Sequence, residues 1–139
     1  KKKIESALNE NLSVIFCIGE ALKEKKRGKT FSILKKQIKS SLEKKFNVNK
    51  IIFAYEPVWS IGTNKIPKMN ELKSTIKFIK NEFKKTFKTK KSPKVLYGGS
   101  VNDKNISLFS SISEIDGFLV GGASQSSKKF IDIMKNYYK

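Results

Sequence analysis

Residues 51–65 read Ile-Ile-Phe-Ala-Tyr-Glu-Pro-Val-Trp-Ser-Ile-Gly-Thr-Asn-Lys, an apolar run that ends in a carboxylate and a proline. The run before Glu56 has the length and β-branched content of a strand buried in a parallel sheet. Glu56 is therefore expected at the carboxyl end of a strand, where α/β sheets and barrels keep their chemistry. Pro57 ends the strand, and Gly62 begins a second bend after a stiff apolar segment. A stiff tip between two bends is typical of a lid.

The rest of the chain alternates short apolar runs with amphipathic segments. Strands are expected at residues 12–18, 50–55, 94–97 and 117–120, and helices at residues 30–46, 72–87 and 102–111. Thr30 is a plausible N-cap, and Ser126 or Ser127 caps a last helix with Phe130, Ile131 and Met134 turned inward. This alternation predicts an α/β fold with four parallel strands and right-handed crossovers. The pattern alone leaves open a small doubly wound sheet or half of a barrel.

Three other stretches combine a strand with glycines in the same way. They are residues 14–20 (Val-Ile-Phe-Cys-Ile-Gly-Glu), 95–101 (Val-Leu-Tyr-Gly-Gly-Ser-Val) and 115–124 (Ile-Asp-Gly-Phe-Leu-Val-Gly-Gly-Ala-Ser). With residues 54–65 they resemble the triosephosphate isomerase family in order and in near spacing, over essentially the whole chain. The resemblance implies a partial (β/α)8 barrel. Because a whole barrel needs roughly 250 residues, residues 1–139 are expected to form the C-terminal half of a single barrel domain, strands five to eight.

The resemblance implies that Glu56 is the general base of an aldose–ketose isomerase. Such an enzyme interconverts dihydroxyacetone phosphate and D-glyceraldehyde 3-phosphate by proton transfer through an enediolate. One carboxylate that lies beside two neighbouring carbons can take a proton from one carbon and return it to the other. The family needs no metal and no organic cofactor for this chemistry, so none is expected here.

The resemblance also implies how a small phosphorylated triose is held. Backbone N–H groups bind anions without a side chain, and the matching positions here are Gly62, Ser100, Gly121 and Gly122. The lid tip is formed by Pro57, Val58 and Trp59. In the family, the carboxylate that matches Glu20 meets the lid tryptophan, and the hydroxyl that matches Tyr97 holds the closed lid.

Three lid positions depart from the family pattern. Ser60 stands where alanine is usual, Asn64 replaces a common glycine, and Pro67 replaces alanine at the second hinge. Asparagine tolerates a positive φ, so the bend at Asn64 is expected to survive. In the family, the N–H at the position of Pro67 donates to the tyrosine hydroxyl. Because proline has no N–H, Tyr97 is expected to lack this lid partner.

The chain alone does not contain the family's whole set of site residues. The electrophilic histidine, the phosphate-neutralising lysine and an adjacent asparagine belong to earlier strands in the family, and this sequence has no histidine. The fragment alone is therefore expected to be inactive. A homodimer is expected for the complete protein.

Composition bounds the alternatives. The net charge is +18, which would suit a basic nucleic-acid-binding module, but Arg27 is the one arginine and the lysines are spread over every expected helix. We therefore expect no nucleic-acid partner. A single cysteine, Cys17, cannot form an internal disulfide and fits a cytoplasmic protein. No apolar run reaches the ~18 residues of a membrane span. The remaining rival is a phosphate-binding (β/α)8 protein without isomerase activity.

Overall fold

The structure is a computed structural model, and it describes residues 1–138. Four parallel strands form one sheet in the order β1-β2-β3-β4. The strands are β1 (Val14–Ile18), β2 (Ile51–Tyr55), β3 (Val95–Tyr97) and β4 (Gly117–Phe118). The α-helices are α1 (Lys2–Asn9), α2 (Leu22–Lys26), α3 (Thr30–Ser41), α4 (Met69–Phe87) and α5 (Ser127–Tyr137). Three 3-10 helices complete the chain: η1 (Val48–Lys50), η2 (Ile106–Ser111) and η3 (Gly122–Gln125).

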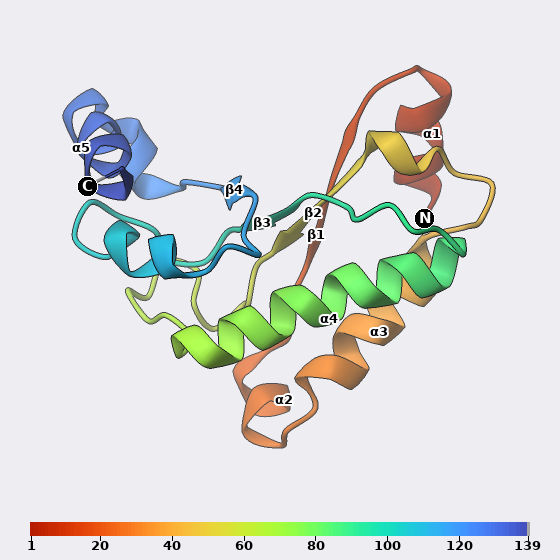
Figure 1. Cartoon of the computed structure of the whole chain (residues 1–139), viewed down its shortest axis with the longest axis horizontal. Coiled ribbons are helices and arrows are strands. Elements are labelled where there is room, and N and C mark those ends of the chain that lie inside the picture. Colours follow the sequence, from red (N-terminus) through yellow and green to blue (C-terminus); the bar gives the residue numbers. More distant parts are fainter. Residues whose placement is uncertain (139) are drawn as a thin grey trace.

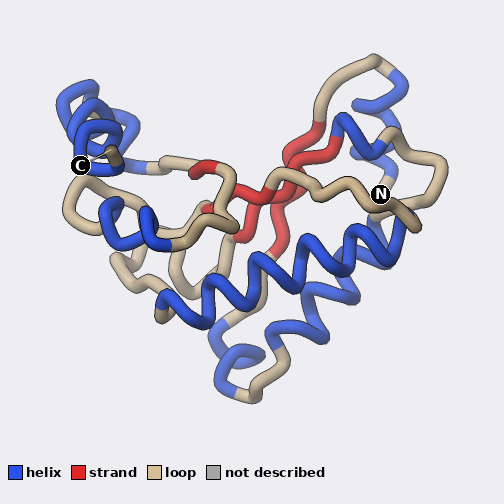
Figure 2. The backbone as a smooth tube through the Cα atoms, in the orientation of Figure 1, coloured by secondary structure: helices blue, strands red, loops and turns tan. Residues whose placement is uncertain are grey.

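The arrangement of the helices decides between a doubly wound sheet and part of a barrel, the two folds that fit the sequence pattern. Helices α3 and α4 lie together on one face of the sheet, and α1 and α5 form two arms at its ends (Figures 1 and 2). Within residues 1–138, no helix crosses the opposite face between these arms. A doubly wound sheet carries helices on both faces and reverses its strand order, whereas barrel strands follow one another in sequence order. The structure therefore favours part of a barrel.

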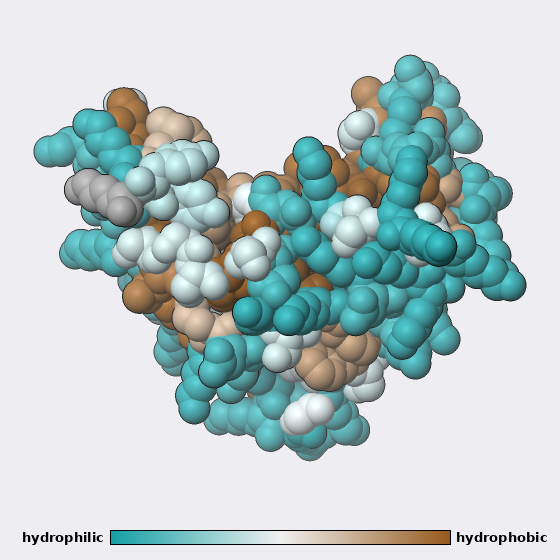
Figure 3. Space-filling model, in the orientation of Figure 1, coloured by the Kyte–Doolittle hydropathy of each residue, from teal (hydrophilic) through white to brown (hydrophobic). Residues whose placement is uncertain are grey.

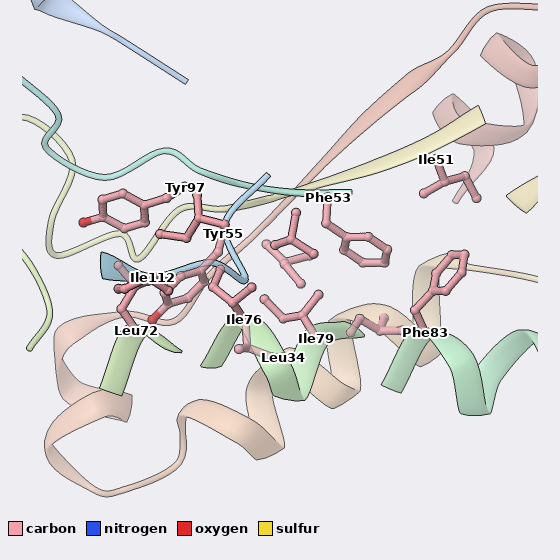
Figure 4. Close-up of a cluster of buried hydrophobic side chains, with 14 of the residues drawn as sticks. Leu34, Ile51, Phe53, Tyr55, Leu72, Ile76, Ile79, Phe83, Tyr97 and Ile112 are labelled. Carbon is pink, nitrogen blue, oxygen red and sulfur yellow. The ribbon is translucent and has the colours of Figure 1, made fainter. Parts of the chain in front are cut away.

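The core lies between the sheet and helices α3 and α4. Alternate residues of β2 and β3 point toward the helices, because side chains alternate across a strand. In Figure 4 they meet the apolar side chains of α4, which recur at helical spacing. The completely buried residues of this layer include Phe53, Val95, Tyr97, Leu34, Leu72, Ile76 and Ile79.

The opposite face of the sheet is open. Two residues of β1, Ile15 and Cys17, point toward this open face, and Ile15 is 48% exposed. Cys17 is paired in register with Ala54 of β2. Side chains two residues apart in a strand point to the same face, so Glu56 points to the same open face as Ala54. Figure 3 shows that the surface between the arms of α1 and α5 is hollowed, with hydrophobic residues at its floor.

Several expectations about the elements need correction. Helix α3 ends at Ser41 instead of residue 46, and the helix expected at residues 102–111 is the 3-10 helix η2. Strand β4 ends at Phe118 instead of residue 120, since β3, its neighbour, has only three residues to pair with. Thr30 is the first residue of α3, and Lys29 is its N-cap. Helix α5 is capped by the Ser126 side chain as predicted, but its inward residue is Ile133.

The three residues predicted to face inward from α5, Phe130, Ile131 and Met134, are 39%, 44% and 46% exposed. The reason is that one side of α5 packs on η2 and η3, whereas the opposite side of α5 is not covered by any of the described residues. Within residues 1–138, no helix is long and apolar enough to cross a membrane.

Candidate active site

Glu56 lies where three strands end together. Its backbone N–H donates to the carbonyl of Ile18 at 2.8 Å, and the N–H of Gly98 donates to the carbonyl of Tyr55 at 2.9 Å. These bonds continue the sheet past the last paired residues. A Cβ at Gly98 would lie 2.7 Å from Glu56 Oε1, and one at Gly19 would lie 1.9 Å from the Glu56 carbonyl oxygen. The two glycines therefore leave the room that the Glu56 backbone and side chain occupy.

The Cys17 thiol lies beside the Glu56 carboxylate, close enough for the carboxylate to change the pKa of the thiol. Partial burial, reinforced by the neighbouring negative carboxylate of Glu56, raises the pKa of this thiol to about 11. The thiol thus stays protonated at neutral pH. The sequence interpretation used Cys17 only as a sign of compartment. The signal that could have found it is the register, which sets Cys17 opposite Ala54, two residues before Glu56.

A cleft of about 720 Å³ opens at this end of the sheet. Glu56 lines it together with all four predicted phosphate-binding residues, Gly62, Ser100, Gly121 and Gly122. A Cβ at Gly121 or Gly122 would meet no atom within 4 Å, so the backbone there is open to a ligand. Gly62 has a φ of +67°, which glycine adopts without strain.

Two lysines also line this cleft, Lys104 and Lys129. The sequence interpretation missed them, because two charges among 30 basic residues carry no signal of their own. Their positive charges raise the local concentration of an anionic ligand at the mouth of the cleft.

The lid tip is anchored on a buried carboxylate. Trp59 Nε1 donates to Glu20 Oε1 at 2.9 Å, and Glu20 is fully buried. The Tyr55 hydroxyl donates to the same carboxylate, with distances of 3.2 and 3.1 Å to its two oxygens. Burial, reinforced by the charge of Glu20, raises the pKa of Tyr55. Lys25 Nζ lies 4.9 Å from the centre of the Trp59 ring.

The two residues before Trp59 are held differently. The N–H of Val58 donates to the carbonyl of Glu20 at 3.1 Å, and its side chain is 57% exposed. Pro57 is buried. The structure therefore brings Glu20 and the lid tip together, and Tyr55 is a third member of this contact that the sequence interpretation did not include.

Tyr97 has a different lid partner in place of the N–H that Pro67 lacks. Its hydroxyl lies 3.1 Å from Ser60 Oγ, inside the protein, and burial raises the pKa of Tyr97 to about 12. Ser100 Oγ accepts from the N–H of Asn64 at 3.0 Å and donates to the Ser60 carbonyl at 2.6 Å. Asn64 has a φ of +59°, as its bend requires. The lid, residues 57–67, is thus docked on residues 98–100.

Comparisons with known proteins agree on one family. The family model described as triosephosphate isomerase matches residues 1–137. The "Triosephosphate isomerase" of Dictyoglomus thermophilum is 45% identical over 97% of this chain and 56% of its own length. The "Triosephosphate isomerase, chloroplastic" of Fragaria ananassa is 40% identical over 96% of this chain and 43% of its own.

A solved structure gives the same result for the fold. The crystal structure of triosephosphate isomerase from Bartonella henselae matches 99% of this chain and 55% of its own length, with a TM-score of 0.84 and 31% identity. The predicted partial (β/α)8 barrel is therefore confirmed. The chain spans about half the length of the curated relatives it matches. On the family model, the relatives and the fold together, this chain belongs to the triosephosphate isomerase family.

Proposed function

We propose that these residues form the C-terminal half of the barrel of a triosephosphate isomerase. In the complete protein they supply the base and the phosphate cradle for interconversion of dihydroxyacetone phosphate and D-glyceraldehyde 3-phosphate. The observation that carries the proposal is that Glu56 lines one cleft with Gly62, Ser100, Gly121 and Gly122. The family membership of the chain supports the same reaction.

Each part of the cleft has a distinct task in this reaction. The Glu56 carboxylate removes a proton from the carbon beside the substrate carbonyl and returns it to the neighbouring carbon. The N–H groups of Gly62, Gly121 and Gly122 hold the phosphate beside Ser100, whose own N–H donates to Ser60 Oγ. This keeps the triose in one orientation while the proton moves. The apolar side chains of Ile61 and Val120 line the same cleft and limit the access of water.

The remaining groups of the site come from outside these residues. This chain has no histidine, so the electrophile of the family comes from the other half of the barrel. We assign the phosphate-neutralising lysine to that half as well, from the resemblance to the family. The proposal includes a cytoplasmic homodimer that acts on a small phosphorylated triose without a cofactor.

Substitution of the base tests the proposal. Glu56→Gln keeps the size of the side chain and removes its basicity, so the complete protein should fold normally. Its kcat should fall by about 10²- to 10⁴-fold or more, which is the typical range for general acid–base groups. The measurement is the steady-state rate in both directions, with thermal unfolding as the check on folding.

Glu10→Gln is the matched control, because Glu10 is exposed at the end of α1, away from the cleft. It should leave kcat unchanged. If Glu56→Gln retained the turnover of the parent protein at unchanged stability, Glu56 would not be the base. A phosphate-binding barrel protein without isomerase activity would then be the better description.

A further inference from the structure

Ser60 is a polar residue that directly follows the apolar lid tip, and it is completely buried. Its hydroxyl contacts three different parts of the chain. Ser60 Oγ donates to the carbonyl of Lys65 within the lid, lies 3.1 Å from the Tyr97 hydroxyl of β3, and accepts from the N–H of Ser100 at 3.2 Å. One oxygen atom therefore joins both ends of the lid to the segment that follows β3.

The three contacts use the whole hydrogen-bonding capacity of the hydroxyl. A serine hydroxyl has one proton to donate and two lone pairs that accept. Its proton goes to Lys65, so the Tyr97 hydroxyl and the Ser100 N–H are the two donors. Tyr97 is 0% exposed, so no solvent replaces this partner if the Ser60 hydroxyl is removed.

The glycine at position 99 provides the space for this arrangement. A Cβ at Gly99 would lie 2.2 Å from the Tyr97 hydroxyl and 2.5 Å from Ser60 Oγ. The two hydroxyls therefore meet directly over the Gly99 backbone, where a larger residue would keep them apart.

From these contacts we propose that Ser60 is a positioning residue whose hydroxyl latches the lid, residues 57–67, onto residues 98–100. The latch requires no N–H at the second hinge, which explains how Pro67 is accommodated there. It acts beside the cleft, because Gly62 and Asn64 of the lid and Gly98 to Ser100 all line the cleft that contains Glu56. Its effect on catalysis rests on the proposed function, but its effect on the lid does not.

Limited trypsin digestion of the complete protein measures the latch without any assay of activity. Lys65 is exposed in the lid, and Lys90 is exposed in the connector between α4 and β3. Ser60→Ala should speed cleavage after Lys65 by about tenfold relative to cleavage after Lys90. This is the expected size because loss of a buried hydrogen-bonding group changes an equilibrium by roughly that factor. Fragments are followed by mass spectrometry.

A double-mutant cycle assigns the effect to the Ser60–Tyr97 contact. Tyr97→Phe alone should speed the same cleavage by about threefold, and it should add little in the Ser60→Ala background. Ser110→Ala and Tyr137→Phe remove hydroxyls away from the lid and should leave the cleavage ratio unchanged. In the complete enzyme, kcat/KM should be lowest in the variants in which Lys65 is cleaved fastest, and it should be unchanged in the two control variants.

Equal cleavage ratios in the parent protein and in Ser60→Ala would overturn the latch. Additive effects of the two substitutions would overturn the Ser60–Tyr97 contact as its basis. If Ser60→Ala fails to fold, an unchanged ratio in Tyr97→Phe overturns it instead. A further outcome separates the two proposals. If the parent protein shows no isomerase activity but Ser60→Ala still speeds cleavage after Lys65, the proposed function is refuted and the latch is supported.

Discussion

At the scale of single residues, the site depends on pairs that are distant in sequence and adjacent in space. The position of Glu56 at the end of a strand was predictable, because an apolar run that ends in a carboxylate and a proline is a local pattern, whereas its proposed role as base rests on the family resemblance. The contact of Glu56 with Cys17 was not predictable, since it depends on the register between β1 and β2. The contact of Ser60 in the lid with Tyr97 in β3 was not predictable either, because it depends on how the lid packs on the sheet.

The pairing of Cys17 with Glu56 predicts an unusually unreactive thiol. Because only the thiolate is nucleophilic and the pKa of Cys17 is raised to about 11, alkylation by iodoacetamide at about pH 8 should be at least tenfold slower than for a free thiol. The rate should increase with pH and reach its midpoint near the raised pKa. The loss of the single cysteine's thiol, followed by mass spectrometry, measures this rate.

Glu56→Gln should make Cys17 react faster, because removal of the negative charge lowers the pKa of the thiol toward its ordinary value. Glu10→Gln is again the control and should have no effect. If the alkylation rate were the same in Glu56→Gln and in the parent protein, burial alone would protect the thiol and the contact would contribute nothing.

At the scale of elements, periodicity predicted the long and buried segments well. Helix α4 and strand β2 follow the residue pattern closely, since each buries a repeating apolar face. The last strand and the last helix were predicted less well. Their burial depends on neighbours, and the expected inward face of α5 is exposed because the described residues leave one of its flanks uncovered.

The prediction at the scale of elements concerns Gly122, the first residue of η3. Gly122→Val should leave folding intact, because a Cβ at Gly122 meets no protein atom within 4 Å. The added side chain would project into the cleft where the phosphate is proposed to lie. Inorganic phosphate should compete with substrate in the complete protein, and its inhibition constant should rise by about tenfold or more in this variant.

The matched control is Ser127→Val, at the start of α5, which is exposed and does not line the cleft. It should leave phosphate inhibition unchanged. An inhibition constant that stays the same in Gly122→Val would remove Gly122 from the cradle, and the phosphate would have to bind elsewhere.

At the scale of the whole molecule, the sheet has an open face and two outer strands. Hydrophobic side chains line the hollow between α1 and α5 (Figure 3), and Ile15 of β1 is 48% exposed. Strands β1 and β4 each pair on one side only among residues 1–138. Exposed apolar surface and unpaired strand edges favour association with other chains. The family resemblance made this incompleteness predictable from the sequence, because a whole barrel is about twice as long.

A purified chain of residues 1–139 should therefore bind a hydrophobic dye, form soluble oligomers or aggregates, and show no isomerase activity. The physical reason is that the apolar face and both edges remain open, and that no histidine is present to act as the electrophile. Co-expression with the N-terminal half of the Dictyoglomus thermophilum relative should reduce dye binding and restore measurable activity, because that half supplies the missing strands. Restored activity should disappear in Glu56→Gln, which shows that this chain contributes the base. A chain of residues 1–139 that is monomeric, unfolds cooperatively and is active by itself would contradict the half-barrel assignment.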